Sequence, residues 1–220
     1  MALTGHGLEP DRLPVTPSIS AAEALERLRQ GNQRFVSGAR QETVGSGSLE
    51  ALVAAQHPFA AVLGCADARV PVEIVFDQAP GDLFVVRVAG NVAGPSQIGS
   101  LEYAVERLGT RLIVVLAHTS CGAVAAAVAE AQRPTATGSP HLRTIVDRIR
   151  ASIEPLLVAA SDLDADELHR RAVRANARST AARLTRESDV VRRVIGEDDF
   201  RVVVAEYSLE SGRVEFLGDA

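Results

Sequence analysis

Two cysteines and a histidine stand where two apolar segments of the chain end. Cys65 ends the segment 59–65, and His118 and Cys121 follow the segment 111–117. The first segment is continuously apolar, which is typical of a parallel strand that is covered on both faces, and the second is apolar after Arg111. The ends of neighbouring parallel strands lie about 5 Å apart, so these three side chains could surround one ion. Thiolate and imidazole ligands together favour Zn²⁺.

An aspartate and an arginine lie just beyond the first of these segments, at Asp67 and Arg69. Three protein ligands leave one position of a tetrahedral zinc site open, and water bound there has its pKa lowered to about 7. Asp67 could take that position itself and close the site. Alternatively, Arg69 could hold the carboxylate back by a bidentate pair, so that it accepts a hydrogen bond from zinc-bound hydroxide. The residues alone leave both arrangements open.

Each of these residues also has an ordinary structural explanation. A cysteine at the end of a core strand is often only packed there, an isolated His-x-x-Cys is a weak motif, and Asp67 with Arg69 could be a simple ion pair. The only two cysteines of the chain could instead form one disulfide. Metal ligation is favoured because all five side chains fall at the ends of two strands. Gly90 and Asn91 do not indicate a dinucleotide site, since no Gly-x-Gly-x-x-Gly follows them.

The segments that position these residues alternate between strands and helices. Ser20 and Glu23 form a capping-box pattern at the start of a helix that Gly38 ends. Alternation of this kind predicts an α/β fold with right-handed crossovers. A loose arm is expected over 1–17, followed by a single domain over 18–220. Strands are expected over 59–65, 83–88, 111–117, 201–207 and 214–217, and helices over 97–108, 121–132 and, as two or three segments, within 141–195.

The composition excludes several classes of protein. The chain of 220 residues is 46% hydrophobic and carries a formal net charge of −5, which gives no reason to expect nucleic acid binding. No apolar run approaches the roughly 18 residues of a membrane span, and the first twenty residues do not resemble a signal peptide. Two cysteines are too few for a secreted disulfide scaffold, so we expect a cytoplasmic protein that acts on a small molecule.

Two motifs in the expected order resemble the paired signatures of the β-class carbonic anhydrases. They are CADARVP at 65–71 and HTSCG at 118–122, and the stretch FDQAPGDLFVVRVAGN at 76–91 is also similar to that family. The similarity runs from about 18 to 208. It implies four parallel strands extended by one antiparallel strand, a homodimer that often assembles further, and reversible hydration of carbon dioxide to bicarbonate and a proton. It also implies one Zn²⁺ per subunit, bound by Cys65, His118 and Cys121. Asp67 and Arg69 would form the catalytic dyad.

The resemblance also implies a substrate pocket and a subtype. Gln56, Phe84 and Tyr103 match the positions that line an apolar pocket in the subtype that is active at all ordinary pH values. The other subtype has a tryptophan where this chain has Val62, and this chain has no tryptophan. We therefore expect the open, plant-like subtype. Val88 would complete the apolar wall, and Gln56 would donate a hydrogen bond to a substrate oxygen.

Two further positions next to the motifs bear on the site. Gly122 would start a helix whose dipole favours ionisation of the preceding Cys121, and its backbone could face the substrate. Many family members have serine where this chain has Ala68, a change that should tune the site without abolishing it.

Three alternatives share the same residues. A zinc hydrolase of carbon disulfide or carbonyl sulfide would use the same fold and ligands. A non-catalytic zinc or redox sensor would have Asp67 bound to the ion, and a thiol switch would join Cys65 to Cys121 when the metal is lost. His57 is a weak candidate for a proton shuttle, although His57, His141 and His169 all lie in polar sequence and are expected to be solvated.

Overall fold

The computed structural model describes residues 19–41, 49–134, 139–159, 163–195 and 199–219, so the arm expected over 1–17 lies outside the described residues. One sheet of five strands has the order β2-β1-β3-β4-β5. All neighbouring pairs are parallel except β4 with β5. The expected α/β fold, with four parallel strands and one antiparallel edge strand, is confirmed. The strands are β1 (Ala60–Gly64), β2 (Leu83–Arg87), β3 (Leu112–His118), β4 (Arg201–Tyr207) and β5 (Val214–Asp219).

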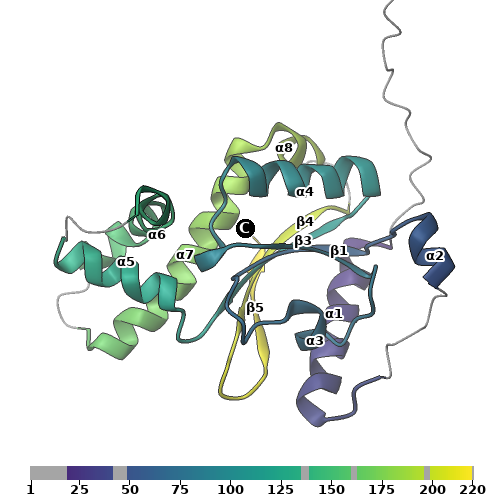
Figure 1. The fold of residues 1–220 in the computed structure, drawn as a ribbon, viewed down its shortest axis with the longest axis horizontal. Helices are drawn as coiled ribbons and strands as arrows, with labels where there is room; N and C mark the ends of the chain where they lie inside the picture. The colour runs from purple at the N-terminus through teal and green to yellow at the C-terminus, as the bar shows by residue number, and fades with distance from the viewer. Residues whose placement is uncertain (1–18, 42–48, 135–138, 160–162, 196–198, 220) are drawn as a thin grey trace, which may run out of the picture.

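Helices cover both faces of this sheet (Figure 1). One buried apolar cluster joins the sheet to α4 through α8, and the other joins it to α1 and α3. The helices are α1 (Ala21–Ser37), α2 (Leu49–Ala54), α3 (Val72–Val75), α4 (Pro95–Leu108), α5 (Gly122–Gln132), α6 (Pro140–Ala159), α7 (Ala165–Glu187) and α8 (Asp189–Val194), with a 3₁₀ turn η1 (Ala89–Asn91).

The two central strands are buried along their whole length, which explains their uninterrupted apolar sequence. Side chains alternate between the two faces along each of them. In β1, Ala61 and Leu63 join the cluster under α4 to α8, whereas Ala60 and Val62 join the cluster under α1 and α3. Because both strands are held on both edges and both faces, the residues at their ends are fixed in position.

The order of the strands reverses at β1. The chain leaves β1 for β2 on one side and then returns through α4 to β3 on the other side. In open α/β sheets, ligands bind beyond the carboxyl ends of the strands at such a switch point. Cys65 follows β1 directly and His118 is the last residue of β3. The topology therefore brings together the two residues that the sequence singled out.

The helix boundaries agree with the sequence at some positions and differ at others. The capping box of Ser20 and Glu23 is present, and Gly38 ends α1 in a left-handed conformation. Helix α4 begins at Pro95, two residues before the expected start at 97, because proline occupies the first helical turn. The short helix α3 was not expected from the sequence. No helix among the described residues is long and apolar enough to cross a membrane.

Candidate metal centre

Three potential ligand atoms converge beyond the ends of β1 and β3. The sulfur atoms of Cys65 and Cys121 and a ring nitrogen of His118 all lie within 4.8 Å of one another, and all three residues are buried. Cys121 reaches this place because it is the N-cap residue of α5, three residues after β3 ends. Both cysteines are free thiols. The convergence that the sequence predicted is present.

The histidine ring presents an unused nitrogen to this cluster. Nδ1 of His118 lies 2.9 Å from the carbonyl oxygen of Thr119, so the tautomer with a proton on Nδ1 donates to that carbonyl. Nε2 is then left with a lone pair, and this buried atom has no hydrogen-bond partner among the described residues. Together with two sulfurs, an unpartnered imidazole nitrogen is the donor set of a tetrahedral Zn²⁺ site with one open position. The residues present fit the ion that the sequence predicted.

The two thiols share a proton. A hydrogen bond from Cys121 is the main reason that the pKa of Cys65 falls to about 4, although burial opposes the shift. The backbone N–H of Gly90 also donates to Cys65 Sγ, at 3.3 Å. The pKa of Cys121 is raised by that same pairing and by burial, while the N–H groups of Ala123 and Val124 at the start of α5 lower it. The pairing therefore lowers the pKa of Cys65 and raises that of Cys121, so the two thiols hold about one proton between them.

Asp67 lies beside the cluster and is held by Arg69. The arginine donates from Nε to Oδ1 at 2.9 Å and from Nη2 to Oδ2 at 2.8 Å, and its backbone N–H also donates to Oδ1 at 2.9 Å. Hydrogen bonding by Arg69 is the main reason that the pKa of Asp67 lies well below its usual range. Oδ2 of Asp67 is 3.8 Å from Nε2 of His118. The carboxylate is therefore charged, adjacent to the ligands and drawn toward the guanidinium.

A second arginine fixes the loop that carries these residues, and the sequence reasoning missed it. Arg87, at the end of β2, donates from Nε to the carbonyl of Cys65 at 3.1 Å and from Nη2 to the carbonyl of Asp67 at 2.6 Å. The sequence offered one indication of this role, since Arg87 is the single charged residue in the otherwise apolar segment 83–88. Its contacts stabilise the turn that places the first cysteine and the aspartate side by side.

The expected pocket residues are partly brought together. The rings of Phe84 and Tyr103 have centroids 6.2 Å apart, and Tyr103 is 50% exposed. Val88 is half-buried directly after β2, and Gly122 is the first residue of α5. Gln56 lies on the exposed segment between α2 and β1. The two rings thus form an apolar surface that is open on one side.

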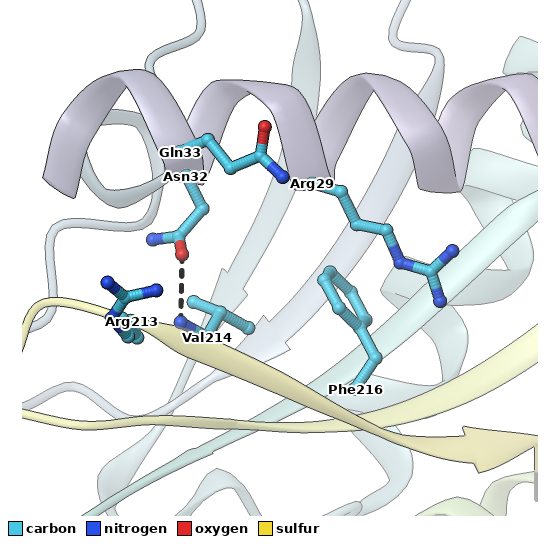
Figure 2. Close-up of a pocket in the computed structure, with 6 residues that line it drawn as sticks. All are labelled: Arg29, Asn32, Gln33, Arg213, Val214 and Phe216. Carbon is cyan, nitrogen blue, oxygen red and sulfur yellow. Dashed lines mark hydrogen bonds between the residues drawn. The ribbon is translucent and has the colours of Figure 1, made fainter. Parts of the chain in front are cut away.

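Two other features lie outside this group. A pocket of about 370 Å³ between α1 and β5 contains none of the predicted site residues (Figure 2); it is lined by Arg29, Asn32, Gln33, Arg213, Val214 and Phe216. The expectation that His169 is solvated is wrong at Nε2, which is buried and has no hydrogen-bond partner among the described residues. Burial is the main reason that the pKa of His169 is lowered. Its neighbours in sequence are polar, so only the packing of α7 reveals this.

Comparison with known proteins agrees with the fold and the site, which define an α/β protein with a buried Cys-His-Cys group that could hold a metal ion. A family model described as carbonic anhydrase matches residues 60–214. Carbonic anhydrase 2 of Mycobacterium tuberculosis is 41% identical over 199 residues, covering 90% of this chain and 93% of the relative. A carbonic anhydrase of Mycolicibacterium smegmatis is 40% identical over 213 residues, covering 92% and 98%. The crystal structure of the β-carbonic anhydrase CafA of Aspergillus fumigatus covers 89% of each chain with a TM-score of 0.70 and 29% identity.

The chain therefore belongs to the carbonic anhydrase family, in its β class, whose members hydrate carbon dioxide reversibly. The alternatives of a carbon disulfide or carbonyl sulfide hydrolase and of a non-catalytic sensor are not favoured by these relatives.

Proposed function

We propose that the protein hydrates carbon dioxide at one Zn²⁺ held by Cys65, His118 and Cys121, with Asp67 and Arg69 as the catalytic dyad. The observation that carries this proposal is the group of three buried donor atoms within 4.8 Å beside a carboxylate that Arg69 holds by two side-chain hydrogen bonds. A bound Zn²⁺ would act as a Lewis acid that makes water a nucleophile at neutral pH.

The dyad has two tasks in this proposal. The charged carboxylate of Asp67 accepts a hydrogen bond from the attacking water and so directs a lone pair at the carbon atom of the substrate. Arg69 keeps that carboxylate from becoming a fourth ligand, since both of its oxygens accept from the guanidinium. Because the pKa of Asp67 is well below its usual range, the carboxylate stays ionised throughout the neutral range. A closed sensor site with Asp67 on the ion is disfavoured by this bidentate pair.

The apolar surface formed by Phe84 and Tyr103 suits a linear, apolar substrate. Phe84, Val88 and Tyr103 would hold carbon dioxide and exclude competing water, and Gln56 would donate to an oxygen as charge develops there. Gly122 would let the substrate approach the backbone at the start of α5, where an added Cβ would meet open space. With Val62 in place of a tryptophan, these residues support the open, plant-like subtype.

The same surface supports a homo-oligomer. The Phe84–Tyr103 surface is open although it is apolar, and β2 is an edge strand that is only half-buried. A second copy of the chain would cover both and complete the pocket. The solved β-carbonic anhydrases of Sordaria macrospora are tetrameric, but at 23% identity they support the fold alone. We infer a homodimer or a larger assembly, and residues 18–220 as one catalytic domain preceded by the arm 1–17.

Two thiolate ligands also favour a reducing compartment, since oxidation to a disulfide would remove them from the metal. The proposed location is therefore the cytoplasm.

Metal analysis combined with stopped-flow hydration tests the proposal. We expect one zinc per chain and activity from about pH 6.5 to pH 9, because water at such a site titrates near pH 7. Replacement of Arg69 by alanine should lower turnover about 100-fold with zinc retained, since the Asp67 carboxylate loses its orientation toward the attacking water. Arg170→Ala is the matched control, because Arg170 makes a similar two-nitrogen pair with Glu167 on α7. Unchanged turnover in Arg69→Ala, or protein without stoichiometric metal, would contradict the proposal.

A further inference from the structure

The turn after β2 is built so that a backbone N–H faces the first metal ligand. Gly90, the middle residue of η1, has a φ of +68° and donates its N–H to Cys65 Sγ at 3.3 Å. An added Cβ at Gly90 would lie 2.5 Å from Cδ1 of Ile149 and 3.3 Å from Cβ of Ala123. Glycine is therefore required here both by the left-handed conformation and by the close approach of α5 and α6.

A side chain from a distant helix holds this turn from the other side. Nδ2 of Asn176, on α7, donates to the carbonyl of Gly90 at 2.8 Å, across 86 residues of sequence. Asn176 is fully buried. Its amide must present Nδ2 to the turn, since only a donor can satisfy a carbonyl. Both backbone polar groups of Gly90 are thus committed, one to Cys65 and one to Asn176.

Asn176 carries a buried polar atom that lacks a hydrogen-bond partner among the described residues, which is energetically unfavourable. Oδ1 of Asn176 and Nδ2 of the neighbouring Asn91 are buried without hydrogen-bond partners among the described residues. An unpaired buried acceptor is unfavourable, and an apolar side chain of similar shape would avoid it. The donation to Gly90 is the contact that an apolar residue could not supply.

We propose that Asn176 is a positioning residue for the metal centre, acting through Gly90 on Cys65. This inference rests on the proposed function. By fixing the Gly90 turn, Asn176 keeps an N–H directed at the ligand sulfur, and such bonds around a metal site orient the ligand and tune its electron donation to the ion. The hydrogen bond of Asn176 is made to Gly90 and not to a ligand atom, so its effect on the metal site is indirect.

Metal affinity and the cobalt spectrum provide readouts that do not depend on turnover. Zinc affinity would be measured by competition with a chromogenic chelator, and Co²⁺ would replace zinc to report the sulfur-to-cobalt charge-transfer band. Asn176→Leu removes the donor at nearly constant shape, and Asn176→Ala, which cannot clash, serves where leucine does not fold. We expect zinc affinity to fall at least tenfold and the charge-transfer band to shift.

Asn32 provides a matched control. It is a buried asparagine in α1 that donates to the carbonyls of Val75 and Gly212, and α1 packs in a different buried cluster from the one that contains Cys65 and Cys121. Asn32→Leu should lower stability but leave zinc affinity and the cobalt spectrum unchanged. If Asn32→Leu and Asn176→Leu weaken zinc binding equally, Asn176 has only a general structural role and the inference is overturned.

A second variant tests the route through the turn. Gly90→Ala should reproduce the effect of Asn176→Leu, and the double variant should bind zinc about as well as either single variant, because both act on one hydrogen bond to Cys65. Additive losses would overturn the inference. Wild-type protein that binds neither Zn²⁺ nor Co²⁺ would refute the proposed function, whereas normal wild-type binding with unaffected Asn176 variants would refute this inference alone.

Discussion

The buried carboxylate of Asp77 gives a quantitative test of how α1 is held against the sheet. Its side chain has no exposed surface, and it follows α3 with a φ of +48°. Arg34 of α1 donates from Nε to Oδ2 at 2.6 Å, and the N–H of Gln41 donates to the same oxygen at 3.2 Å. Arg40 is more distant, with Nε 3.7 Å from Oδ1, and is 46% exposed. Arg34 is therefore the principal partner of a buried charge.

Replacing Arg34 by alanine should destabilise the fold substantially. Breaking a buried ion pair by removing one partner costs about 3–5 kcal/mol. The N–H of Gln41 and the charge of Arg40 remain, so the lower limit applies, about 3 kcal/mol. For a domain of this size each kcal/mol changes the melting temperature by about 2–4 °C, which predicts a decrease of about 6–12 °C.

Urea unfolding followed by circular dichroism would measure this change, with the m-value checked for constancy. Arg40→Ala is the control, because an exposed partner at this distance contributes less than about 1 kcal/mol. Equal losses in the two variants, or a loss below about 1 kcal/mol in Arg34→Ala, would refute the reasoning that burial and short distance make Arg34 the dominant partner.

Two further predictions concern the metal and the packing of α1. Because Cys65 and Cys121 share about one proton, zinc binding near pH 6 should release about one proton from the thiol pair, so the affinity should fall about tenfold per pH unit as the pH falls. Calorimetry in buffers of different ionisation enthalpy measures that number at about pH 6, where water at a zinc site with a pKa of about 7 keeps its proton, and a value near zero or two would contradict the shared proton. Gly31→Ala should lower stability by about 3 kcal/mol or more despite the better helix propensity of alanine, because its Cβ would lie 1.8 Å from the carbonyl oxygen of Phe76. A chemical denaturation curve unchanged from wild type would show that α1 can move away from α3 without cost.

The sequence predicted the strands and the ligand group because both are local or topological. Continuous apolar runs identified β1 and β3, and the rule that parallel strands end at one edge then brought Cys65 near His118. The Asp67–Arg69 pair was one of two arrangements that the sequence left open. The structure shows the bidentate pair between Arg69 and Asp67. The sequence could not predict it, because the pairing depends on where the loop after β1 directs the two side chains.

Contacts between distant parts of the chain could not be predicted in this way. Asn176 is an unremarkable polar position in α7 until the packing of that helix brings it to Gly90. The burial of Nε2 in His169 likewise depends on the face that α7 turns inward, which the polar residues around it conceal. Helix α3 was missed because four residues are too few for a helical period to appear in the sequence.

The placement of the ligands at the ends of paired strands has a consequence for metal exchange. Strand β1 is hydrogen-bonded to β2 and β3, and β3 is bonded to β1 and β4, so the backbone that carries Cys65 and His118 is ordered by the sheet and not by the ion. Little of the free energy of coordination is then consumed in organising the polypeptide, in contrast to small domains that fold only around their zinc. We therefore expect loss and uptake of the ion to be separate from unfolding, with the metal-free chain retaining its fold and rebinding zinc.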